Sequence, residues 1–298
     1  MGGETLPFPC SLDPRGAARA CVDFPPDHPQ SGVVGAPLCF YVRARARSVG
    51  YSVGAMQTEI HNGQGERLAT TFTAGGTDSN AIVVIGHGLT SDRTRPWSVA
   101  LSAALASRGI ASLRVAFSGN GDSEGSFVDS TPSKEVADLG AVLDRLEGRR
   151  VAYVGHSMGA LVGCLRAAVD DRIRALVSLA GMVHSAEFFM RLFADLEPGE
   201  VLLDKPGKPL GIALRDDLLA IDSALPRASA VSVPWLLVHG DADDVVPIGH
   251  SRDVAAALGK RVHLIELDGV DHSFTGVETP CMEQHVAPWL AGVLTGPE

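Results

Sequence analysis

The chain has 298 residues, of which 45% are hydrophobic and 20% are charged, and its formal net charge is −10. This length suits one large domain with at most a small insert, and the negative charge argues against nucleic acid as a partner. No apolar run reaches the 18 residues of a membrane span, and no apolar signal segment is found. The five cysteines lack C-x-x-C spacing, so reduced thiols in a cytoplasmic protein are expected.

Residues 1–55 differ in composition from the rest of the chain. They are rich in proline, lack a regular hydrophobic period and hold three of the five cysteines. Such a composition predicts a poorly ordered N-terminal extension to a domain that spans residues 56–298. Two alternatives stay open: an organelle transit peptide, for which the aspartates of the segment are atypical, or a natural translation start at Met56.

From Met56 onward the hydrophobic pattern is regular. Residues 57–62 and 66–73, separated by Gly-Gln-Gly, predict an antiparallel hairpin. Apolar strand-like runs then alternate with helix-like runs. The predicted strands are 82–85, 110–117, 151–154, 173–179, 235–238 and 262–267, and the predicted helices are 98–108, 132–146, 158–169, 250–258 and 281–294. This alternation predicts an α/β fold with a mostly parallel central sheet and helices on both faces.

An insertion of about fifty residues interrupts this alternation, at about 183–232. We expect it to form a small cap over the carboxyl ends of the strands, where ligands bind in open α/β sheets. Phe188, Phe189 and Phe193 lie at helical spacing within it and are candidates to line an apolar acyl pocket. The alternative is that these phenylalanines only pack the insertion onto the body of the domain.

The sequence GHSMG stands directly between a predicted strand and a predicted helix, with Ser157 at its centre. A strand, a sharp turn and a helix form a nucleophile elbow, which exposes a serine hydroxyl on a tight bend. A second match to the pattern, GDSEG at 121–125, follows a loop and opens no helix. Ser157 is therefore predicted as a nucleophile and Ser123 as a loop residue.

A serine nucleophile needs a base within hydrogen-bond reach, and the base needs an acid that orients it. Two later strands end in the loops HGDADDVVP and DGVDHSF. The carboxyl ends of parallel strands meet at one edge, so these loops are expected beside Ser157. We predict His272 as the general base and Asp243 as its acid, with Asp244 as the alternative acid.

The oxyanion of a tetrahedral intermediate needs N–H donors. The backbone N–H of Met158, which follows the nucleophile, is the first predicted donor. The second is the N–H of Leu89 in the sequence GHGL, where the small Gly88 lets the backbone approach. This chemistry requires no cofactor and no metal.

The motifs GHGL, GHSMG, HGDADDVVP and DGVDHSF resemble those of the α/β-hydrolase superfamily. They are most similar to its branch of feruloyl and cinnamoyl esterases and serine-aminopeptidase-like hydrolases, over about residues 57–294. In that branch the acid lies three residues after the glycine of H-G-x-x-D, which implies Asp243. The branch often carries the loop D-x-x-G-H-G-x-S, whereas this chain has Ala116 and Asn120 at the Asp and His positions.

The leading prediction is a serine carboxylesterase that acts on a small-molecule ester through an acyl-enzyme intermediate, with a small or medium acyl group that can be aromatic. The same triad would serve an amide or peptide hydrolase of the aminopeptidase kind, or a thioesterase. A third class is a catalytically silent binding or scaffold protein, although such proteins usually lack part of the triad. Because hydrolase folds host many chemistries, the pattern identifies neither the natural substrate nor the oligomeric state.

Overall fold

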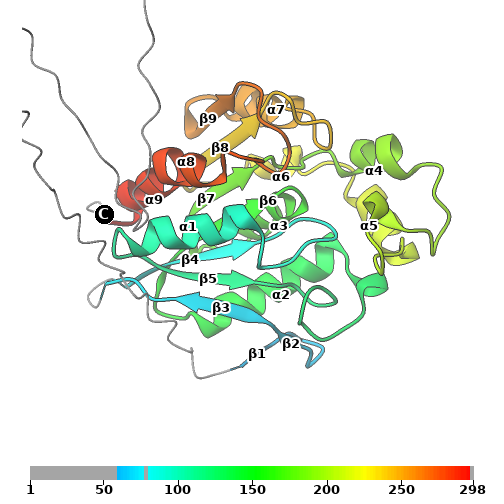
Figure 1. The fold of residues 1–298 in the computed structure, drawn as a ribbon, viewed down its shortest axis with the longest axis horizontal. Helices are drawn as coiled ribbons and strands as arrows, with labels where there is room; N and C mark the ends of the chain where they lie inside the picture. Colours follow the sequence, from blue (N-terminus) through cyan, green and yellow to red (C-terminus); the bar gives the residue numbers. More distant parts are fainter. Residues whose placement is uncertain (1–58, 77–79, 296–298) are drawn as a thin grey trace, which may run out of the picture. The chain divides into compact units, whose positions relative to one another are not determined.

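A seven-stranded sheet forms the centre of the fold in the computed structural model, which describes residues 59–76 and 80–295 (Figure 1). The strands are β3 (Thr70–Thr73), β4 (Ala81–Gly86), β5 (Ala111–Val115), β6 (Arg150–His156), β7 (Ile173–Leu179), β8 (Trp235–Gly240) and β9 (Val262–Leu267). Their order is β3-β5-β4-β6-β7-β8-β9, and only β3 runs antiparallel to its neighbour. The predicted α/β fold with a mostly parallel sheet is confirmed. The predicted extension, residues 1–55, lies outside the described residues.

Helices cover both faces of the sheet because successive residues of each strand point to opposite sides. In β4, Ile82 and Val84 belong to one hydrophobic core, while Val83 and Ile85 belong to the other. The first core also takes residues of α2 (Pro132–Arg145), α3 (Met158–Ala167) and α7 (Gly249–Leu258). The second takes residues of α1 (Pro96–Ala106), α8 (Glu278–Cys281), α9 (Ala287–Thr295) and the π-helical turn η4 (Met282–Val286) between them. Two short 3₁₀ turns are η1 (Phe127–Asp129) and η3 (Gly259–Arg261).

The predicted hairpin is only partly formed. Strand β1 (Ile60–His61) pairs with β2 (Arg67–Leu68), and the chain then changes partner so that β3 pairs with β5. The switch occurs at Ala69, whose N–H donates to Ser123 Oγ at 2.8 Å and whose carbonyl accepts from the Ala116 N–H at 2.9 Å. The prediction of one strand over 66–73 is therefore wrong, because the second half of that run covers the edge of the main sheet. Ser123 lies in a loop and holds this crossover.

The segment between β7 and β8 contains α4 (Ser185–Phe193), η2 (Leu202–Asp204), α5 (Ile212–Ile221) and α6 (Leu225–Ala228). Figure 1 shows α4 and α5 beyond the arrowheads of β4 and β5, on the side where the parallel strands end. Phe188, Phe189 and Phe193 of α4 are all buried. The insertion thus lies at the edge where the predicted site residues are found.

Two further findings concern the whole described part of the chain. Cys164 and Cys281, its two cysteines, are buried and unpaired. None of the helices in residues 59–76 and 80–295 combines the length and the apolar character that a membrane crossing requires.

Candidate active site

Ser157 occupies a strained turn between β6 and α3. Its φ is 55° and its ψ is −119°, a backbone conformation that non-glycine residues adopt only where the surrounding structure enforces it. The Ser157 N–H donates to the Leu179 carbonyl at 2.9 Å, which extends the pairing of β6 with β7 up to the turn. The sheet therefore fixes the serine at its carboxyl edge.

Two glycines flank Ser157 because the turn brings backbone segments into close contact. A Cβ added to Gly155 would lie 2.2 Å from the Gly159 carbonyl oxygen, and one added to Gly159 would lie 2.4 Å from the His87 carbonyl oxygen. Both distances are far shorter than any van der Waals contact. The G-x-S-x-G pattern is thus a steric requirement of the crossing between strand, helix and the loop after β4.

The loop after β4 runs directly against Ser157. A Cβ added to Gly88 would lie 2.8 Å from the Ser157 Cβ. The buried His87 holds this loop, since its Nδ1–H donates to the Gly88 carbonyl at 2.9 Å and its Nε2 accepts from the Phe117 N–H at 3.0 Å. Burial lowers the pKa of His87 to about 4, so the ring stays neutral at pH 7 and keeps both hydrogen bonds. Leu89 lines the pocket in front of Ser157.

Met158, the other predicted oxyanion donor, directly follows Ser157. It is the first residue of α3, and the first N–H groups of a helix have no intrahelical acceptor. The positive end of the helix dipole also lies here, which favours negative charge next to Ser157.

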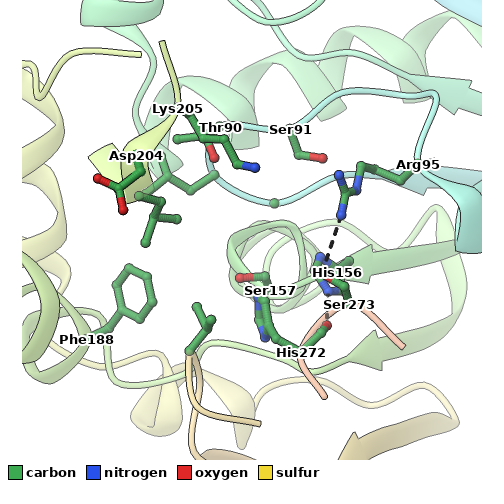
Figure 2. A pocket seen from close by; sticks show the side chains of 14 residues that line it. Thr90, Ser91, Arg95, His156, Ser157, Phe188, Asp204, Lys205, His272 and Ser273 are labelled. Atoms are coloured by element: carbon green, nitrogen blue, oxygen red, sulfur yellow. Dashed lines mark hydrogen bonds between the residues drawn. The ribbon is translucent and has the colours of Figure 1, made fainter. Parts of the chain in front are cut away.

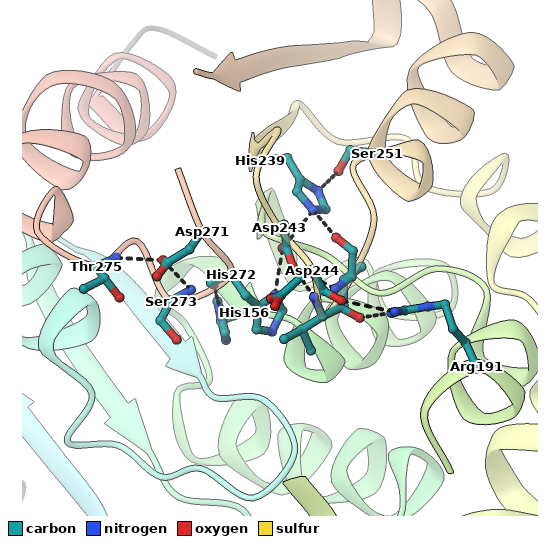
Figure 3. A network of polar contacts seen from close by, with 12 residues as sticks. His156, Arg191, His239, Asp243, Asp244, Ser251, Asp271, His272, Ser273 and Thr275 are labelled. Atoms are coloured by element: carbon teal, nitrogen blue, oxygen red, sulfur yellow. Dashed lines mark hydrogen bonds and ion pairs between the residues drawn. The ribbon is translucent and has the colours of Figure 1, made fainter. Parts of the chain in front are cut away.

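His272 and Asp243, in the loops after β9 and β8, form a short hydrogen bond (Figure 3). The distance from His272 Nδ1 to Asp243 Oδ2 is 2.7 Å, and both side chains are largely buried. The second oxygen, Asp243 Oδ1, accepts the N–H groups of Val245 and Val246 at 2.9 and 2.8 Å. Burial by itself raises the pKa of Asp243, but the hydrogen bonds from His239 and His272 outweigh burial and hold this pKa far below its ordinary value.

The other two aspartates of the same loop, Asp241 and Asp244, are exposed. Asp241 Oδ1 accepts the Gly269 N–H at 2.7 Å, and the carbonyl of Asp244 accepts from Arg191 of α4 at 3.1 Å. Arg191 also donates to the carbonyl of Val245, which ties α4 to this loop (Figure 3). The structure therefore places Asp243, and not Asp244, against His272.

Two further histidines, His156 and His239, hold the pair in place. His156 Nε2–H donates to the His272 carbonyl at 2.8 Å, and the two rings lie 4.7 Å apart. His239 Nε2–H points at Asp243 Oδ2 at 3.2 Å and at the Val246 carbonyl at 2.8 Å. Burial and the neighbouring His272 lower the pKa of His156 to about 3. Their places directly before Ser157 and four residues before Asp243 are the only signals that the sequence offers for them.

Ser157 and His272 line one cavity with a volume of about 360 Å³ (Figure 2). Within the described residues no hydrogen bond joins Ser157 Oγ to His272, although both residues line the same cavity. Catalytic hydrogen bonds are often longer in a free enzyme than in its complex with substrate. A cavity of this size suits a small or medium ligand.

The inserted segment contributes unequally to this cavity. Phe188 lines it, whereas Phe189 and Phe193 are not among its lining residues and pack in the core, with Phe193 5.6 Å from the ring of Phe188. Leu203 and Asp204 of η2 also line the cavity, and both have positive φ. Of the three candidate pocket phenylalanines, the structure therefore places only Phe188 in the wall.

The chain is similar in sequence to a known family and to two known proteins. A family model described as serine aminopeptidase, S33, matches residues 77–200. Two uncharacterised proteins from two strains of Mycobacterium tuberculosis are 29% identical over 209 residues, which are 67% of this chain. The chain covers 65% of the length of these curated relatives.

Two solved structures illustrate the likeness in three dimensions. Est1E from Butyrivibrio proteoclasticus, solved with ferulic acid bound, has a TM-score of 0.71 and 24% identity, over 80% of this chain and 100% of that one. A putative hydrolase from Agrobacterium vitis has a TM-score of 0.67 and 24% identity, over 80% of this chain and 98% of that one. At such identities the likeness is one of fold.

Proposed function

We propose that this chain, which has the α/β-hydrolase fold, is a serine hydrolase that cleaves carboxylic esters of small or medium acyl groups. The observation that carries the proposal is the placement of a strained serine turn and an aspartate-bound histidine on one cavity. A serine becomes a nucleophile only beside a base, and an acid must hold that base in the correct tautomer.

In the proposed reaction, Ser157 Oγ attacks the ester carbonyl and His272 Nε2 takes the hydroxyl proton. Asp243 keeps the proton of His272 on Nδ1 and stabilises the imidazolium that forms. The backbone N–H groups of Leu89 and Met158 hold the oxyanion. His272 then protonates the leaving alcohol, and the same residue activates a water that hydrolyses the acyl-enzyme.

The depressed pKa of Asp243 fits this role, because its carboxylate stays ionised wherever His272 takes up a proton. An aminopeptidase would need carboxylates that hold the substrate amine. Glu187, Asp195 and Glu197 of the insertion do not line the cavity, whereas Asp204 does. Ester hydrolysis requires no such group, and we therefore place it ahead of amide hydrolysis.

The test is hydrolysis of p-nitrophenyl esters from acetate to decanoate, together with an aryl ferulate, by the wild type and by Ser157→Ala. We expect the wild type to turn over the shorter esters and Ser157→Ala to lose at least about 10³-fold in kcat. Circular dichroism and the unfolding temperature show whether the variant is folded. A fluorophosphonate should label the wild type at Ser157 and leave Ser157→Ala unlabelled.

Two results would overturn the proposal. Equal turnover by both proteins would mean that Ser157 is not the nucleophile. A folded wild type that neither hydrolyses any ester nor reacts with the fluorophosphonate would instead indicate a silent binding protein.

A further inference from the structure

Arg95 brings an unneutralised positive charge to the cavity of Ser157. Its side chain lines the cavity, and its Nη2 lies 3.4 Å from Ser273 Oγ, a long and weak contact. Among residues 59–76 and 80–295 no carboxylate forms an ion pair with it. The neighbouring Arg93, in contrast, pairs with Asp122 at 2.8 Å. An arginine without a carboxylate, in a chain of net charge −10, leaves room for an anion that arrives with the ligand.

Ser91 adds an unused hydrogen-bonding group to the same wall. Its Oγ is buried and has no hydrogen-bond partner within the described part of the chain, although Ser91 lines the cavity. Figure 2 shows Ser91 and Arg95 on the side of the cavity away from Phe188. Buried hydroxyls without a partner are uncommon in folded proteins, and one beside a ligand site is a candidate donor to the ligand.

The other charged groups of the cavity balance each other. Asp204 and Lys205 are exposed neighbours of opposite charge, and Figure 2 shows Asp204 across the cavity from Arg95. Leu203 and Val245 also line the cavity, and both pack against the hydrophobic core that contains Phe188. Arg95 therefore brings the unpaired positive charge on one side of the cavity, while Phe188 brings apolar surface on the side away from it.

We propose that the natural ester carries a carboxylate in its alcohol half, which Arg95 and Ser91 bind. A planar guanidinium matches a carboxylate with two parallel hydrogen bonds, and such charge-assisted bonds are stronger than neutral ones. This inference rests on the proposed ester hydrolysis and specifies its substrate class.

The position of His272 determines which half of the ester carries the charge. His272 must reach the leaving oxygen in order to protonate it, so the alcohol half has to lie beside His272. Ser273, the contact of Arg95, is the next residue in the chain. The acyl half then extends away from Arg95 and toward Phe188.

The experiment compares 4-(butanoyloxy)benzoate with its neutral methyl ester as substrates. We measure the ratio of their kcat/KM values for the wild type, Arg95→Met, Arg95→Lys and Arg145→Met. Comparing one protein with another cancels the difference in chemical reactivity between the two esters. Arg145 is exposed on α2 and does not line the cavity, so its variant controls for the loss of one positive charge.

We expect Arg95→Met to lower the acid-to-ester ratio by about tenfold, the size of one charge-assisted hydrogen bond. Arg95→Lys should recover part of the ratio, because it restores the charge without the planar fork. Arg145→Met should keep the wild-type ratio. A third substrate, phenyl hydrogen glutarate, carries its carboxylate in the acyl half and should show no dependence on Arg95.

Three outcomes would count against the proposals in different ways. An acid-to-ester ratio that is the same in the wild type and in Arg95→Met overturns the anion site. A dependence on Arg95 for phenyl hydrogen glutarate alone overturns the assignment to the alcohol half. Failure of the folded wild type to hydrolyse any of the esters would overturn the proposed function itself.

Discussion

Gly88 shows how strict the steric requirements at the site are for a single residue. A Cβ at this position would lie 2.8 Å from the Ser157 Cβ and 3.2 Å from the His156 carbonyl oxygen. The φ of Gly88 is not positive, so the backbone itself would accept another residue. The glycine is needed because the loop and the serine turn touch, and this contact positions the Leu89 N–H that we propose as an oxyanion donor.

We expect Gly88→Ala to lower kcat by about 10²–10³-fold, because the loop must move away and take one oxyanion donor with it. Ester hydrolysis and the unfolding temperature, measured in parallel, separate this loss from unfolding. Gly249→Ala is the matched control, since a Cβ there meets nothing within 4 Å. A Gly88→Ala enzyme with the kcat of the wild type would refute the role of Leu89.

Helix α4 contributes both to the wall of the cavity and to the hydrophobic core. Phe188 reaches the cavity of Ser157, whereas Phe193 is 2% exposed and packs only in the core. Arg191 on the same helix donates to the loop that carries Asp243. The helix thus links the wall of the cavity to the acid of the site.

We expect Phe188→Ala to move the best acyl chain in the p-nitrophenyl ester series toward longer chains, because it enlarges the cavity. Phe193→Ala should instead cost about 3–5 kcal/mol in the free energy of unfolding and leave the chain-length optimum in place. Urea unfolding and the ester series measure the two effects. Met190→Ala, at a residue that is 57% exposed on α4, should change neither. The reverse pattern for the two phenylalanines would contradict this division of α4.

Across the whole molecule, buried neutral histidines couple stability to pH. Burial lowers the pKa values of His87 and His250 to about 4, and burial together with His272 lowers that of His156 to about 3. An unfolded chain binds protons to these rings near pH 6.5. Their contribution to stability is therefore complete above that pH and is lost as the pH falls toward the folded-state values.

We expect the free energy of unfolding to fall between pH 7 and pH 4.5, with a slope of at most about 1.4 kcal/mol per pH unit for each of the three histidines. Urea unfolding at a series of pH values provides the measurement. His61→Gln, which replaces an exposed histidine, should leave the slope unchanged. A midpoint that stays constant down to pH 5 would show that these rings are not held neutral by the fold.

The local pattern of the sequence was sufficient for most of the fold. Strand and helix runs have periods of two and of about 3.6 residues, which depend only on near neighbours in the chain. The α/β architecture with a mostly parallel sheet follows from these periods and is confirmed. The hairpin prediction failed at Ala69, because the edge of β5 is a partner that local periodicity cannot show.

The candidate site, too, was predicted in part from the sequence and was completed only by the structure. Chain order and strand ends led to Ser157, Asp243 and His272, whose catalytic roles remain predictions for the experiments above. The resemblance implied Asp243 rather than Asp244, and the tertiary structure places Asp243 against His272, but only the tertiary structure brought Arg95 into the cavity. The reason is physical: turn chemistry and hydrophobic period are set by adjacent residues, whereas the wall of a cavity is assembled from loops that are distant in the chain and meet at one edge of the sheet.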